Sequence, residues 1–168
     1  MPVHLAPPDP AALFPVPGIR LGIASAGIKK PGHRDLTLIE LAPGSRVAGV
    51  FTQNRFCAAP VTLCRQHLAS GNEIRALIVN TGNANAGTGE AGLARARESC
   101  VAAGRLLGCS EEQVLPFSTG VILEPLPLDK LLAALPQAQA DLAPDHWYDA
   151  AHAIMTTDIV AKAVSRRV

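Results

Sequence analysis

Apolar residues recur along the chain in short segments with two different spacings. Alternation of apolar residues with other residues predicts half-buried strands at 19–23, 36–41 and 45–52, and a Pro-Gly turn makes the last two a hairpin. The continuous apolar run at 75–80, bounded by polar residues, predicts a fully buried strand. Segment 61–68 fits a strand or a helix, and we expect a short strand that leads into a helical turn.

Spacings of three and four residues predict the helices. One helix is expected over 88–107, with a candidate N-cap at its first residue and Gly108 at its end. A short helix at 129–135 is expected to stop at Pro136. A second, longer helix is expected over about 144–154. Strands and helices together predict an α/β fold of the α+β type.

The segment from Val114 to Ile122 places Ser118, Thr119 and Gly120 between two apolar runs. We interpret these three residues as a turn, because Ser, Thr and Gly favour turns. Gly120 has no Cβ, so its N–H can approach a ligand closely, and the Thr119 hydroxyl adds a second donor. Two such donors can stabilise a developing oxyanion. An ordinary turn without chemistry is the alternative interpretation.

Length and composition indicate one domain. The chain has 168 residues, of which 48% are hydrophobic and 4% aromatic, so its core is expected to consist of small aliphatic side chains. Residues 1–17 are too rich in proline for a regular element and form an extended lead-in. Residues 18–168 form the single predicted domain.

The charge balance excludes several classes of partner. Only 17% of residues are charged, and the formal net charge is +1, so no basic surface is available for nucleic acid or for a membrane. The sequence contains neither a membrane-spanning run nor a signal peptide. We therefore expect a cytoplasmic protein whose partner is a small molecule or another protein.

No motif predicts a metal or a cofactor. The four cysteines form no CxxC pair, and the five histidines are scattered, so we assign no metal ligand. The glycine loop at 80–92 has Walker A glycine spacing but lacks the lysine. Its GxGxxG segment lies too far after the preceding strand for a dinucleotide fold. We therefore expect no bound cofactor.

A series of short segments, taken in order, resembles the ornithine acetyltransferase family, also called glutamate N-acetyltransferase, of arginine biosynthesis. Each segment is weakly specific, but the ordered series from about Gly18 to the C-terminus is highly specific. The segments are 26–30, 34–36, 48–52, 54–55, 58–61, 80–86, 118–122, 124–127 and 155–158.

The resemblance implies an enzyme made as one precursor that cuts itself into an α and a β chain. The threonine exposed at the start of the β chain is the nucleophile, and it carries acetyl from N-acetylornithine to glutamate. Some members also accept acetyl-CoA as a substrate. The implied fold is a layered sandwich of β-sheets flanked by helices, completed by the β chain and superficially like the N-terminal nucleophile enzymes. The implied assembly is an α2β2 heterotetramer.

The resemblance also assigns site residues. Thr119 and Gly120 match the oxyanion pair of the family, and Thr156 and Thr157 match a segment that contacts substrate, with Thr157 slightly favoured. The alternative for the threonine pair is that its hydroxyls only end the preceding helix. We assign no role to the basic residues of the 29–34 loop.

Three positions depart from the family pattern: Leu123 replaces a usual glycine, Ile159 a common threonine, and His33 lies in a divergent loop. The cleavage motif of the family, which ends in Met-Ala-Thr, is expected beyond Val168. We therefore expect this chain to be an α portion that depends on a second chain for its nucleophile. An inactive assembly or binding module and a related amide hydrolase are the alternatives.

Overall fold

The computed structural model describes residues 6–167. A four-stranded sheet of order β1-β2-β3-β4 forms its centre. The strands are β1 (Ile19–Ala24), β2 (Leu36–Leu41), β3 (Ala76–Asn83) and β4 (Val114–Val121). β2 runs antiparallel to both of its neighbours, whereas β4 runs parallel to β3. The crossover between β3 and β4 contains a long helix, as parallel pairing requires.

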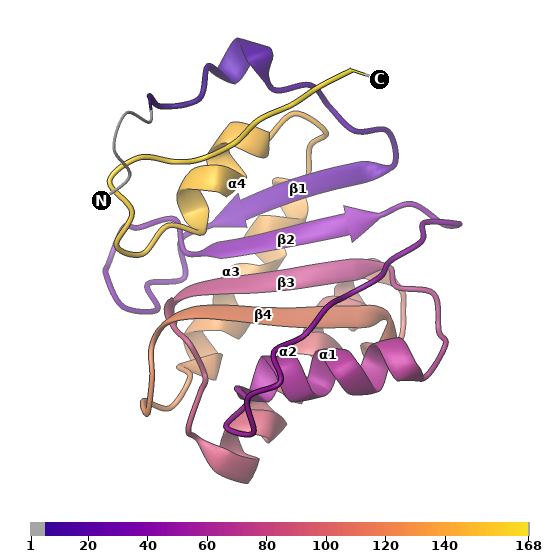
Figure 1. Ribbon diagram of the computed structural model, residues 1–168, viewed down its shortest axis with the longest axis vertical. Coiled ribbons are helices and arrows are strands. Elements are labelled where there is room, and N and C mark those ends of the chain that lie inside the picture. The colour runs from indigo at the N-terminus through magenta and orange to yellow at the C-terminus, as the bar shows by residue number, and fades with distance from the viewer. Residues whose placement is uncertain (1–5, 168) are drawn as a thin grey trace.

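Within residues 6–167, four helices lie around the sheet: α1 (Ala59–Ala69), α2 (Gly89–Leu107), α3 (Leu128–Ala140) and α4 (Trp147–Ala153). The same residues include two short 3-10 turns, η1 (Pro10–Ala12) and η2 (Glu111–Gln113). Figure 1 shows α2 and α3 behind the sheet and α4 in front of β1. The architecture is therefore mixed α/β, as the sequence predicted.

The main core lies between the sheet and the pair α2 and α3. Alternate strand residues such as Leu38 and Ile78 face these helices and meet Cys100 and Leu135, and all four are buried. Leu115 and Leu77 lie on the opposite face, in a smaller cluster with Cys64 of α1. The alternation of strand residues thus gives the sheet one helix-covered face and one face that we call the open face.

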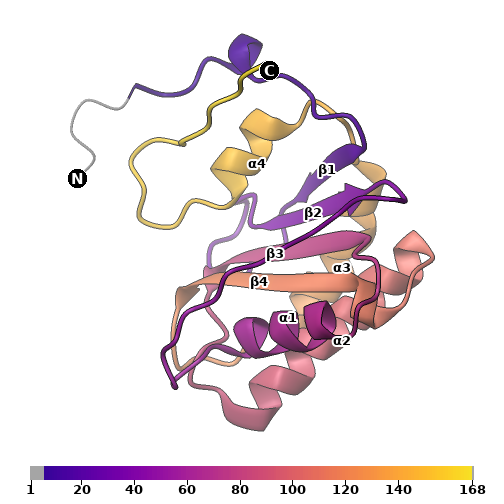
Figure 2. The ribbon, with the colours of Figure 1, turned by 45° about the vertical axis from the view of Figure 1, so that its right-hand side comes forward.

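The open face is covered only in part. α4 packs Ala150 and Ala153 against Leu21 and Ile23 of β1. Figures 1 and 2 both show the segment that follows β2 crossing in front of β3 and β4 on its way to α1. From this segment Val47 and Phe51 contact the smaller cluster, while Val50 is 99% exposed.

Each edge of the sheet is contacted over part of its length. At β1, Leu21 exchanges two backbone hydrogen bonds with Ala143, of 2.9 and 3.0 Å. At β4, the carbonyl of Val114 accepts from His67 Nδ1 at 2.7 Å, and the carbonyl of Pro116 accepts from Cys64 Sγ at 3.1 Å. These contacts cover the middle of β1 and the first half of β4, and the end of β4 stays exposed.

Several predicted elements are confirmed. The strands expected at 19–23, 36–41 and 75–80 are present, and the last continues to Asn83. The helix expected over 88–107 is present and ends at Gly108, whose φ of 70° satisfies a left-handed cap. Thr88 stands at the predicted N-cap position, but its side chain does not cap the helix. Its hydroxyl donates to Asn85 Oδ1 instead.

The hairpin prediction is wrong in its second half. Residues 45–52 form no strand, because both edges of β2 are already paired with β1 and β3. The short strand expected to lead into a helical turn within 61–68 is also absent, and the segment is helical throughout, the alternative that it also fits. Pro60 opens α1 in its first turn, where a missing N–H costs nothing, and Leu63, Cys64 and His67 are buried at helical spacing.

The predicted Ser-Thr-Gly turn is wrong as well. Ser118, Thr119 and Gly120 lie within β4, paired with residues 80–82 of β3. Pro136 does not stop α3, which continues to Ala140. Burial of side chains on both sides of this proline, such as Leu135 and Ala138, offsets the one hydrogen bond that a proline removes.

The ends of the chain also differ from expectation. α4 has seven residues and is shorter than the predicted helix over 144–154. The described part of the lead-in contains η1, where the Asp9 side chain accepts from the Ala11 N–H at 2.9 Å. The first five residues of the lead-in and Val168 lie outside the described residues.

Candidate functional site

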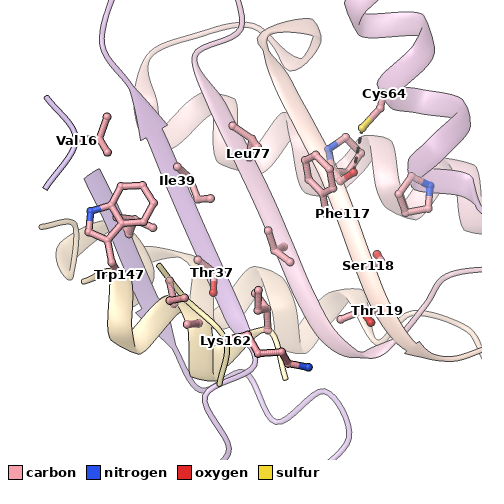
Figure 3. Close-up of a pocket in the computed structure, with 18 of the residues that line it drawn as sticks. Val16, Thr37, Ile39, Cys64, Leu77, Phe117, Ser118, Thr119, Trp147 and Lys162 are labelled. Atoms are coloured by element: carbon pink, nitrogen blue, oxygen red, sulfur yellow. Dashed lines mark hydrogen bonds between the residues drawn. The ribbon is translucent and has the colours of Figure 1, made fainter. Parts of the chain in front are cut away.

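A groove of about 890 Å³ lies on the open face of the sheet. Its floor contains Ile39, Leu77 and Phe117 from three neighbouring strands, and its walls come from α1, α4, the lead-in and the C-terminal segment. Figure 3 shows these side chains together with the polar residues Thr37, Ser118, Thr119 and Lys162. The groove is therefore mainly apolar, with a few polar groups toward one end.

Thr119 and Gly120 lie near the end of β4. Thr119 lines the groove and is half-buried, and Gly120 is exposed with a φ of 135°. Thr119 pairs with Thr81, and Gly120 pairs with Gly82 of β3. The side chains of Thr119 and Phe117 share the open face because they are two residues apart on one strand. The structure thus places Thr119 in the groove, and Gly120 follows it in β4 without lining the groove.

Buried polar side chains support this strand end. Asn80, Asn83 and Asn85 are at most 3% exposed. Ser118 Oγ donates to Asn80 Oδ1 at 2.5 Å, and Asn83 Nδ2 donates to the carbonyl of Glu124 at 3.1 Å. These three asparagines were not predicted as site residues. Their only signal in the sequence is the recurrence of asparagine after a buried strand.

Thr156 and Thr157, the predicted substrate contacts, are exposed and follow α4. They are not among the residues that line the groove with Thr119. Asp158 next to them accepts from Lys162 Nζ, and this hydrogen bond lowers the pKa of the Asp158 carboxyl. The described residues therefore do not bring the two predicted parts of the site into one cavity.

Two of the basic loop residues are held in ion pairs. Lys29 Nζ contacts both oxygens of Glu124, at 2.9 and 2.8 Å, and Arg34 pairs with Asp149. The buried Asp35 carboxylate accepts from three backbone N–H groups, those of residues 26–28, and so fixes the shape of this loop. The loop thus contacts the segment that follows β4 directly.

The thiols of the core are not activated nucleophiles. All four cysteines are free. Burial raises the pKa of Cys64 to about 11 and that of Cys100 to about 12, and burial also raises the pKa of Cys109. A thiol must ionise to attack or to bind a metal, so Cys64 in the groove wall is structural.

Among residues 6–167, no group of three or more His, Cys, Asp or Glu side chains is placed to hold a metal ion. Within the same part of the chain, no helix is both long and apolar enough to cross a membrane.

The sheet with its layer of helices, and the polar strand end beside an apolar groove, define a mixed α/β protein. The chain belongs to the ArgJ family, whose model matches residues 20–168. Members of this family are acetyltransferases of arginine biosynthesis.

Two solved structures are similar to this chain. One is ornithine acetyltransferase from Mycobacterium tuberculosis complexed with ornithine, with a TM-score of 0.81 and 40% identity, covering 87% of this chain and 79% of that one. The other is the arginine biosynthesis bifunctional protein argJ from Bacillus halodurans, with a TM-score of 0.73 and 29% identity, covering 90% of this chain and 76% of that one.

Proposed function

We propose that this chain is the α portion of a self-processing acetyltransferase that moves acetyl from N-acetylornithine to glutamate. The observation that carries the proposal is the position of Thr119 and Gly120 at a strand end beside the groove, in a chain of the ArgJ family. The similar M. tuberculosis enzyme was solved with ornithine, which fits an ornithine-bearing substrate.

The proposed reaction has two steps. The hydroxyl oxygen of a threonine at the start of the β chain attacks the acetyl carbon of N-acetylornithine, and the free amine of that threonine takes the hydroxyl proton. The C–N bond breaks, the proton passes to the leaving nitrogen, and ornithine departs. The amine of glutamate then attacks the acetyl ester, which returns the threonine hydroxyl and gives N-acetylglutamate.

Both steps pass through a tetrahedral oxyanion. The Thr119 hydroxyl and the Gly120 N–H are the proposed donors to that oxygen, and a single donor of this kind is worth about 10²–10³ in kcat. Thr157, or its neighbour Thr156, is proposed to contact the substrate. Because both are exposed in this chain, their role depends on a partner that brings the substrate to them.

The proposed β chain would cover the open face. Phe117 is 41% exposed on the groove floor and Val164 is 88% exposed on its wall, an apolar surface that a partner would bury. The exposed apolar groove favours contact with a partner on the open face of the sheet. An α2β2 assembly, acceptance of acetyl-CoA and a cytoplasmic location are further parts of this proposal.

The test is to express this chain with and without its β chain and to assay acetyl transfer from N-acetylornithine to glutamate. Acetyl transfer that requires both chains, and that this chain does not perform by itself, supports the proposal. Binding of the two chains without turnover would indicate an inactive assembly module. Release of acetate without dependence on glutamate would indicate an amide hydrolase.

A further inference from the structure

The pairing of β4 with β3 becomes irregular near the end of both strands. Residues 81 and 82 pair with 119 and 120 in simple order, but the register then shifts, and Asn83 faces both Thr119 and Val121. Gly82 has a φ of 104° at this irregularity. Such bulges redirect the chain locally and are frequent beside active sites. The geometry of Thr119 and Gly120 therefore depends on what holds the bulge in place.

Asn83 uses its hydrogen-bonding groups to hold that bulge. Its side chain is nearly fully buried, and its Nδ2 donates to the carbonyls of Glu124 and Pro125, at 3.1 and 3.2 Å. Its Oδ1 accepts from the N–H of Asn85 at 2.8 Å. One planar amide thus joins the end of β3 to the segment that follows β4.

A second link anchors the other side of the oxyanion pair. The Asn83 carbonyl accepts from Asn80 Nδ2 at 2.8 Å, and Asn80 Oδ1 accepts from Ser118 Oγ at 2.5 Å. Ser118 immediately precedes Thr119, and Glu124 follows Gly120 by four residues. The stretch that contains both proposed donors is therefore fixed at each end by hydrogen bonds that meet at Asn83.

We propose that Asn83 is a positioning residue for acetyl transfer, which aims the Thr119 hydroxyl and the Gly120 N–H at one oxygen atom. This inference rests on the proposed function and adds to it a residue that never touches substrate. Donors of an oxyanion hole act only when held in place before the reaction, and a displacement of about 1 Å can cost about 10²-fold in rate. A purely structural asparagine would affect stability and not turnover.

Asn83→Asp is the sharpest variant, because it keeps the size of the side chain and turns the donor toward two carbonyls into an acceptor. Asn72→Asp is the matched control: Asn72 is exposed and its Nδ2 donates to Glu112 on the surface. Ser118→Ala is a milder second variant that removes only the link to Asn80. All are made in the full precursor, so that both chains are present.

The experiment measures kcat and KM of the processed enzyme, together with amide hydrogen exchange of residues 118–124. For Asn83→Asp we expect kcat to fall at least about tenfold, KM for N-acetylornithine to change less than about threefold, and exchange at 118–124 to rise. Ser118→Ala should show the same pattern more weakly, and it decides the question if Asn83→Asp does not fold. Asn72→Asp should match the wild type.

An unchanged kcat in a folded Asn83 variant, or a loss confined to KM, would overturn the inference. Wild-type enzyme without acetyl transfer would instead refute the proposed function. In that case hydrogen exchange still decides whether Asn83 holds the strand end: unaltered exchange at 118–124 would overturn the positioning claim, and raised exchange would support it.

Discussion

Gly120 of β4 lies directly opposite Gly82 of β3, its partner in the sheet. A Cβ on Gly120 would stand 2.3 Å from the carbonyl carbon of Gly82, far inside van der Waals contact. Glycine at position 120 is therefore required by packing and by its positive φ, apart from any contact with a ligand. The same close packing restricts the backbone next to Thr119 at the exposed end of β4.

The packing predicts that Gly120→Ala destabilises the fold more than another glycine substitution at positive φ. Gly32 is the control for a positive φ, at 73° and with no atom within 4 Å of an added Cβ, so the difference reports the close packing at Gly120 together with its less accessible φ of 135°. We expect Gly120→Ala to lower the free energy of unfolding by about 1–3 kcal/mol more than Gly32→Ala, as measured by urea denaturation. Equal losses would show that position 120 is not tightly packed.

Thr119→Val tests the proposed oxyanion donor. Valine keeps the branched shape and removes the hydroxyl, so kcat of the assembled enzyme should fall about a hundredfold or more while the chains still associate. Thr119→Ser keeps a hydroxyl and should lose much less. Steady-state kinetics and size-exclusion chromatography measure the two effects. An unaltered rate in Thr119→Val would remove the assignment.

Leu123 has a backbone that leucine rarely adopts. Its φ is 64°, its side chain is 66% exposed, and it lies over Gly87. A left-handed conformation costs a residue with a Cβ about 1–2 kcal/mol, a cost that glycine avoids. Leu123→Gly should therefore be more stable than Leu123→Ala by about 1 kcal/mol in chemical denaturation. Equal stability of Leu123→Ala and Leu123→Gly would contradict the claim that the backbone at position 123 is strained.

The buried thiols predict how stability changes at alkaline pH. Burial raises the pKa of Cys64 from 9.0 to about 11 and that of Cys100 from 9.0 to about 12. Above pH 9 the unfolded chain loses these protons while the folded chain keeps them, so the free energy of unfolding falls as pH rises toward 11. Denaturation at several pH values should show a smaller fall in the double variant C64A/C100A. An identical slope would contradict the prediction.

The sequence predicted best those elements whose signal is local. The helix α2 has both apolar spacing and a terminal glycine, and β1, β2 and β3 have clear apolar runs. Segment 45–52 also alternates, but whether it becomes a strand depends on a free edge of β2, which pairing with distant β3 removes. The spacing of apolar residues in 45–52 cannot show that this edge of β2 is already paired.

The family motif could name candidate residues, but their geometry could not be predicted from the sequence. The family motif identified Thr119 and Gly120, yet their place inside β4 follows from parallel pairing with β3. Asn83 could not be singled out, because its role depends on carbonyls about 40 residues away in the chain, at 124 and 125. Such contacts exist only after the sheet has formed.

The most direct test of the central claim is to trap the acetyl group. The processed enzyme is incubated with N-acetylornithine without glutamate, and each chain is examined by peptide mass spectrometry. We predict one acetyl group on the N-terminal threonine of the β chain and none on this chain. An acetyl group bound to a residue of this chain, or none on either chain of an enzyme that is active when glutamate is added, would contradict the account.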